Sequence, residues 1–262
     1  MYQRYAKFHC NRSNRRKFVD GALYTDLFED CTDIITPITD RVIELDVTIQ
    51  STGEHTSILI YCSSNENDQL LIGLNKLGEA MKLCPDNTNR RKNDDIGMMH
   101  VIGKGRLGNG SVGVYKLTDS SHAIATATRE ITQNAKRYYN ACGLGDDIDI
   151  LKKKSHKYGQ MGDNFFFVST IVQSHDLVNS AHYDCDDATI SIATWTEQIV
   201  YKERKWFFIL PNTTRDGRSG IIIPLRHGIT IRWDGSKIFH CSMIGEDGGN
   251  GHLWSTLFGC KK

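Results

Sequence analysis

The second half of the chain is a succession of short apolar runs separated by turn residues, and this pattern limits the fold most strongly. Turn pairs such as Asp216-Gly217, Asp234-Gly235 and Gly248-Gly249 stand between the runs. These intervals leave no room for crossover helices, so neighbouring strands must pair antiparallel. The pattern predicts an α+β protein with a jelly-roll sandwich or barrel and helices packed outside it. The runs are 165–172, 188–195, 206–210, 220–225, 229–233, 238–241 and 253–258.

The first half of the chain mixes strand and helix patterns. Residues 41–49 alternate apolar and polar side chains, and 57–62 form a more apolar run, so both segments are predicted strands. A helical stripe is expected over 69–83, and a capped helix over 119–142. Polar residues crowd between Pro85 and Asp95, which indicates an exposed loop or domain joint.

We divide the chain accordingly. Residues 1–160 are expected to form a mixed α/β flanking region packed on the core, and residues 161–262 the β core itself. The run Lys152-Lys153-Lys154 is either a nucleic-acid or nuclear-import patch or a solvated loop. The loop is favoured for so short a run.

Charge and cysteine content limit the partners and the compartment. There are 32 Lys and Arg against 31 Asp and Glu, a net charge of +1, which excludes a protein that coats nucleic acid by charge alone. The eight cysteines form no CxxC pair, which favours reduced thiols in an intracellular protein, nuclear or cytoplasmic. We expect no membrane partner, because no apolar stretch is long enough to cross a bilayer and the N-terminus lacks the apolar region of a secretory signal.

One His-x-Asp triplet, His182-Tyr183-Asp184, lies between the first two predicted core strands. A later strand, its Asp234-Gly235 turn and a short return strand carry the chain to His240. If these segments belong to one barrel, His182, Asp184 and His240 can converge. Two imidazoles and one carboxylate on one face of a metal are typical of non-haem Fe(II) sites, whereas zinc prefers four ligands in a tetrahedron. The alternative is that these are ordinary hydrogen-bonded side chains.

At these residues the sequence resembles the Fe(II)/2-oxoglutarate-dependent dioxygenase superfamily, which is built on a double-stranded β-helix. His182 and Asp184 match the family's His-x-Asp motif. Residues 227–235 are similar to the strand and Asp-Gly turn that precede its distal histidine, here His240; His227 is the rival for that role. The resemblance spans roughly residues 165–260. It implies that Fe(II) is held by His182, Asp184 and His240, with 2-oxoglutarate as co-substrate and ascorbate as a further possible reductant.

The sequence departs from the family where the distal carboxylate of 2-oxoglutarate is usually anchored. No Arg or Lys stands ten to fourteen residues after His240, where His252 is the one candidate cation. Arg232 is the preferred substitute if its strand turns its polar face inward, because a guanidinium binds a carboxylate through two donors. Lys202, Arg204 and Lys205 are weaker choices. Trp254 and Tyr183 are further candidates for contact with the co-substrate.

The family resemblance implies hydroxylation or oxidative demethylation of a substrate. Aromatic residues near the expected site and basic runs at 11–17, 90–92 and 152–154 favour a modified DNA or RNA base slightly over a protein side chain. The alternative function is a non-catalytic binding module on the same scaffold with a vestigial metal site.

Overall fold

A computed structural model provides the structure of the protein. It describes residues 2–10, 31–84, 96–106, 111–115, 118, 121–158, 168–179, 181–184, 190–197, 206–211, 213–214, 220–244 and 252–260. The expected loop at 85–95 and the side chains of Lys202, Arg204 and Lys205 lie outside these residues.

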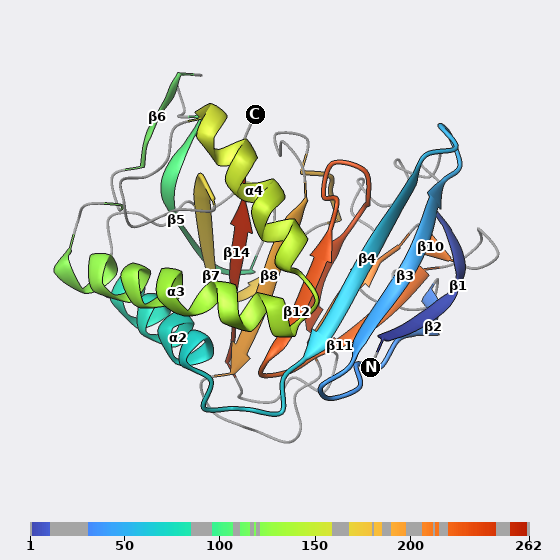
Figure 1. The fold of residues 1–262 in the computed structure, drawn as a ribbon, viewed down its shortest axis with the longest axis horizontal. Coiled ribbons are helices and arrows are strands. Elements are labelled where there is room, and N and C mark those ends of the chain that lie inside the picture. Colours follow the sequence, from blue (N-terminus) through green and yellow to red (C-terminus); the bar gives the residue numbers. More distant parts are fainter. Residues whose placement is uncertain are drawn as a thin grey trace.

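A large mixed sheet is the main element of the fold (Figure 1). Its core strands pair antiparallel: β14 (Leu253–Gly259) lies between β7 (Thr170–Val178) and β8 (Ser191–Glu197), with the pairs Ser255–Ser174 and Leu257–Ala193. In spatial order the strands are β10 (Thr213–Thr214), β1 (Tyr2–Cys10), β3 (Val42–Ile49), β4 (His55–Cys62), β12 (Ile229–Trp233), β8 (Ser191–Glu197), β14 (Leu253–Gly259), β7 (Thr170–Val178), β5 (Ile96–Arg106) and β6 (Val112–Val114).

A smaller sheet packs against the large one. It consists of β13 (Cys241–Ile244), β9 (Trp206–Leu210), β11 (Gly220–Leu225) and β2 (Cys31–Ile34), in that order. The apolar side chains between the two sheets form the inner core, to which β3 contributes Ile43 and Leu45, β11 contributes Ile221, and β12 contributes Ile229 and Ile231. The two sheets therefore enclose the interior of a jelly roll, as the run of short strands predicted.

Three helices, α2 (Gln69–Lys82), α3 (His122–Ala141) and α4 (Gly145–Tyr158), cover the outer face of the large sheet in the part of the chain that the structure describes (Figure 1). Asp68 caps α2 by accepting the N–H of Leu70 at 2.8 Å, and Ser121 caps α3 by accepting that of Ile124 at 3.2 Å. The apolar stripe of α2 is buried against α3 and the sheet. The strands β8 and β12 are thus largely buried on both faces.

The predicted elements of the first half compare closely with the observed ones. The strands expected at 41–49 and 57–62 are β3 and β4, and the helices expected at 69–83 and 119–142 are α2 and α3. The expectation of a loop at Lys152–Lys154 is wrong, because these exposed lysines lie in α4, whose Leu151 and Ser155 are buried.

Strands from both sides of residue 160 share the large sheet, since β4 pairs directly with β12. None of the described helices combines the length and the apolar character needed to span a membrane.

Candidate metal centre

The backbone itself joins the two histidines of the predicted triad. The N–H of His182 donates to the carbonyl of His240 at 3.0 Å, and the N–H of His240 donates to the carbonyl of His182 at 3.1 Å. This isolated antiparallel bridge lies where the chain enters β13. Asp184 is fixed in the same way, because its N–H donates to the carbonyl of Gly235 at 2.8 Å in the turn after β12. The sequence motif and the Asp-Gly turn therefore meet as expected.

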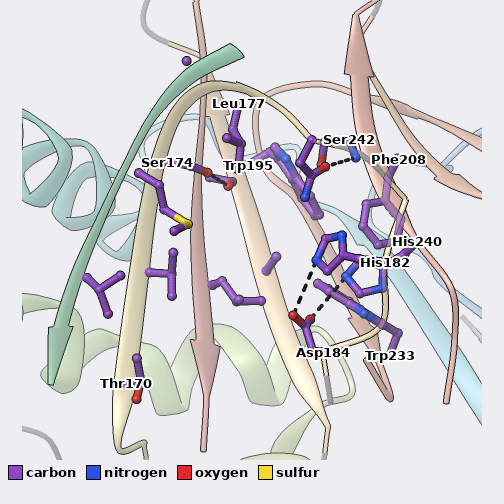
Figure 2. Close-up of a pocket in the computed structure, with 18 of the residues that line it drawn as sticks. Thr170, Ser174, Leu177, His182, Asp184, Trp195, Phe208, Trp233, His240 and Ser242 are labelled. Carbon is purple, nitrogen blue, oxygen red and sulfur yellow. Dashed lines mark hydrogen bonds and ion pairs between the residues drawn. The ribbon is translucent and has the colours of Figure 1, made fainter. Parts of the chain in front are cut away.

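The three side chains converge on one point. The Nε2 atom of His182 lies 3.5 Å from Oδ1 of Asp184, and Nε2 of His240 lies 3.3 Å from Oδ2 of the same carboxylate (Figure 2). One nitrogen or oxygen atom from each residue lies within 4.8 Å of the other two. The carboxylate thus places one oxygen against each imidazole.

A backbone carbonyl selects the tautomer of His240. Its Nδ1 lies 3.0 Å from the carbonyl oxygen of Ile238, and a carbonyl can only accept. Nδ1 must therefore carry a hydrogen, which leaves Nε2 as the ring nitrogen that faces Asp184. Metal-binding histidines are commonly oriented by such a bond from the second ring nitrogen.

The ionised form of Asp184 is favoured despite its burial. The residue is 9% exposed and His240 is 4% exposed. Burial opposes ionisation of the carboxyl, but hydrogen bonds and favourable charge interactions with His182 and His240 outweigh it and hold the pKa of Asp184 well below its usual value. The site therefore offers a carboxylate, the form that binds a cation.

The triad lines a cavity of about 360 Å³ between the two sheets (Figure 2). Aromatic rings stand close around it: the ring centroid of Trp233 is 5.1 Å from that of His240, and that of Phe208 is 5.6 Å away. The rest of the wall is mostly apolar, with a few hydroxyl and amide groups. Its other lining residues include Met99, Val101, Val172, Ser174, Leu177, Asn179, Ala193, Trp195, Ser242, Ser255 and Leu257.

The donor set fits a divalent transition metal. Two imidazole nitrogens and one carboxylate occupy one side of the convergence point, and the cavity lies on the other. This is the arrangement that non-haem Fe(II) uses to leave positions for a co-substrate and dioxygen.

The structure contradicts the expectation that Arg232 points into the barrel. Its neighbour Trp233 lines the cavity, whereas Arg232 points to the opposite face of β12, towards α4. There its Nη2 lies 2.9 Å from Oδ1 of Asp147, and its Nη1 donates to the carbonyl of Ser57 at 2.7 Å. Both faces of the strand are buried, so the alternation of side chains was correct but the inward face was wrongly assigned.

Trp254 and Tyr183 also lie outside the cavity wall. Trp254 faces α2, where the Nζ of Lys82 is 5.8 Å from its ring centroid. The ring of Tyr183 packs against Phe239, with centroids 4.9 Å apart. His227, the rival distal histidine, accepts the N–H of Glu197 at 3.2 Å instead of joining the triad. The preference for His240 over His227 thus agrees with the geometry.

Sequence reasoning missed the polar residues of the cavity wall, Ser174, Asn179, Ser242 and Ser255. Their signal was present in part, since Ser255 interrupts an otherwise apolar face of its strand.

No protein-family model matches the sequence, and no curated protein matches it. Among solved structures, NgTET1 in complex with 5mC DNA is similar, with 12% identity and a TM-score of 0.54 over 88% of this chain and 83% of that one. This likeness shows the fold of the chain, a jelly roll of the double-stranded β-helix type.

Two further solved structures are less similar in shape. A prolyl-4-hydroxylase from Pseudomonas putida has 10% identity and a TM-score of 0.42, over 74% of this chain and 87% of that one. A 2OG-Fe(II) oxygenase family oxidoreductase from Burkholderia pseudomallei has 10% identity and a TM-score of 0.39, over 71% of this chain and 76% of that one.

Proposed function

We propose that this protein is a non-haem Fe(II)-dependent dioxygenase that uses 2-oxoglutarate. The observation that carries the proposal is the convergence of His182, Asp184 and His240 at the wall of one cavity, each held by a backbone hydrogen bond. These three residues would hold the metal. Bound Fe(II), 2-oxoglutarate and dioxygen supply an oxidation that converts the co-substrate to succinate and carbon dioxide and hydroxylates a C–H bond of the substrate.

The protein's own contribution is placement and exclusion of water. Asp184, kept ionised, neutralises part of the metal's charge, and His240 is oriented by the Ile238 carbonyl. The aromatic rings of Trp195, Phe208 and Trp233 give the cavity a low-polarity wall, which keeps bulk water from the reacting bond.

For the substrate we favour a modified nucleic-acid base over a protein side chain. Two observations support this choice: the wall contains flat aromatic rings, and the similar NgTET1 structure is a complex with 5mC DNA. A base that enters such a cavity must leave the duplex and stack on aromatic side chains. If the methyl group of a methylated base is hydroxylated, demethylation of the base is one outcome.

Three further parts of the proposal concern the surroundings of this site. The core at 161–262 would supply the metal site, and residues 1–160 would supply the flanking layer. Two described cysteines, Cys62 and Cys142, are free thiols, which supports a reducing compartment, nucleus or cytoplasm. Ascorbate would serve only to keep the iron reduced.

The test is metal binding followed by co-substrate turnover. Under anaerobic conditions the wild type should bind one Fe(II) and develop a visible charge-transfer band with 2-oxoglutarate; with air it should release succinate. The Asp184→Ala variant should bind no Fe(II), develop no charge-transfer band and release no succinate, because one of the three proposed ligands is missing. Asp46→Ala, on the exposed part of β3, is the matched control and should keep all three. An Asp184→Ala variant with wild-type turnover would sink the assignment.

The alternative, a non-catalytic binding module on the same scaffold, gives a different result in the same assay. It predicts no succinate above background from iron-loaded wild-type protein, even in the presence of candidate substrates.

A further inference from the structure

A small recess adjoins the cavity and shares part of its wall with it. This recess has a volume of about 10 Å³, close to that of one water molecule, and is lined by the hydroxyl-bearing residues Ser174, Ser242 and Ser255. The same three serines also line the main cavity. The remaining walls of the recess are apolar: Leu177, Trp195, Trp206, Leu225 and Leu253.

The three serines come from three strands that the fold holds in place. Ser174 of β7 and Ser255 of β14 are directly paired across the large sheet, and their hydroxyl groups are hydrogen-bonded to each other. Ser242 comes from β13 of the smaller sheet, where its N–H donates to Oδ1 of Asn179 at 2.7 Å. In Figure 2, Ser174 and Ser242 lie on the far side of the two imidazoles from Asp184.

The hydrogens of these groups can be counted. Ser174 and Ser255 carry one O–H each, and their mutual bond uses one of the two. One O–H of the pair is left to point into the cavity, and Ser242 supplies a second. Two O–H donors in a largely apolar cavity suit a group with two acceptor oxygens. Hydrogen bonds to such a group are strongest when the group is charged.

We propose that Ser174, Ser242 and Ser255 form a three-hydroxyl subsite that binds the distal carboxylate of the co-substrate 2-oxoglutarate. Among the cavity-lining residues that the structure describes there is no Lys or Arg, and Arg232 is held on the opposite face by Asp147. The subsite thus recognises the carboxylate by hydrogen bonds from neutral groups. This inference rests on the proposed iron site, since the other end of the same molecule must bind the metal.

The experiment compares two keto acids on the full-length, Fe(II)-loaded protein without oxygen. The probes are 2-oxoglutarate and 2-oxobutyrate, in which a hydrogen replaces the distal carboxyl group. Affinity is measured by the charge-transfer band and by calorimetry. Wild type should prefer 2-oxoglutarate by about tenfold or more. Ser242→Ala and the double variant Ser174→Ala/Ser255→Ala each remove one of the two donors, and each should weaken the affinity for 2-oxoglutarate about tenfold, as expected for the loss of a hydrogen bond to a charged group. Neither change should alter the affinity for 2-oxobutyrate.

Two variants complete the design. Ser155→Ala removes a buried hydroxyl in α4, away from the cavity, and should change neither affinity. Ser242→Cys keeps the volume but donates weakly, and should fall between wild type and Ser242→Ala; it replaces the alanine variant if that variant unfolds.

The outcomes separate the two proposals. If both keto acids bind and the double variant Ser242→Ala/Ser255→Ala keeps wild-type affinity for 2-oxoglutarate, the hydroxyl subsite is overturned and the iron site stands. A wild type that shows no preference between the keto acids overturns the subsite as well. If the wild type binds no iron at all, both proposals fail.

Discussion

Gly235 lies directly against the carboxylate of Asp184. A Cβ atom at Gly235 would be 2.8 Å from Oδ2 and 3.0 Å from the Cβ of Asp184, and the Gly235 carbonyl accepts the N–H of the same residue. The glycine of the Asp-Gly turn therefore leaves the space in which the carboxylate of Asp184, a proposed metal ligand, sits.

The first prediction follows from this contact. Gly235→Ala should push the Asp184 carboxylate away from the histidines and lower Fe(II) affinity at least about tenfold, since supporting residues of metal sites commonly have effects of this size. Iron titration measures the effect, and thermal unfolding shows whether the fold is kept. Lys237→Ala, in the same turn but paired with Glu54, is the control and should bind iron normally. Equal affinities in the two variants would contradict the prediction.

The second prediction concerns the ion pair between Arg232 and Asp147. Arg232→Leu leaves a buried carboxylate without its partner and should lower the free energy of unfolding by about 3 kcal/mol, measured by denaturant titration. The double variant with Asp147→Leu should recover most of that loss. Affinity for 2-oxoglutarate should not change in either variant. A stable Arg232→Leu protein that no longer binds 2-oxoglutarate would restore the arginine as the anchor.

The third prediction tests the packing of α2 on the sheet. Alanine is normally favoured over glycine inside a helix by about 1 kcal/mol. At Gly78, however, a Cβ would lie 2.4 Å from the ring of Trp254, which is buried and packed against His175. Gly78→Ala should therefore destabilise the protein by about 2 kcal/mol. At Gly73 the nearest atom is 3.2 Å away in the side chain of Ile131, so Gly73→Ala should cost clearly less.

The fourth prediction is a dependence of stability on pH. Burial, together with the charges of His100 and Lys82, lowers the pKa of His175 to about 4. In the unfolded chain the same imidazole titrates near 6.5. Between these values the unfolded state binds the extra proton, so stability should fall as the pH drops below about 6.5 and this fall should end near 4.

A variant isolates this contribution. His175→Gln should reduce the stability difference between pH 7 and pH 5 by about 1–2 kcal/mol, measured by denaturant titration at both values. His55→Gln, at an exposed position on β4, is the control and should leave the difference unchanged. A His175→Gln protein with the wild-type pH dependence would contradict the prediction.

The sequence predicted the elements, and the convergence of His182, Asp184 and His240, better than the orientation of strands. The alternation on β12 correctly placed Ile229, Ile231 and Trp233 on one face and Arg232 on the other. It could not say which face is inward, because helices bury one face and the second sheet buries the other. Polarity favoured Arg232 as the inward residue, yet Asp147, distant in sequence, provides its partner.

His182, Asp184 and His240 could be picked out as candidate ligands because the ability to bind a metal depends on the residue type. Few combinations of His and Asp suit a metal, and the strands around them had clear patterns. The serine-lined recess could not be predicted, because it depends on the register of β7 against β14. The contact between Gly235 and Asp184 could not be predicted either, because it depends on the close approach of a turn to that side chain. Such relationships arise only when the two sheets are assembled.

The reciprocal bonds between His182 and His240 have a consequence for how the metal is exchanged. They fix the two imidazoles by backbone pairing, which forms with the fold and does not need an ion to organise it. Little conformational entropy is then lost when the metal binds, and little structure is lost when it leaves. A chelator should therefore strip the protein to a folded apoprotein that accepts iron again, unlike small metal-dependent domains that unfold on demetallation.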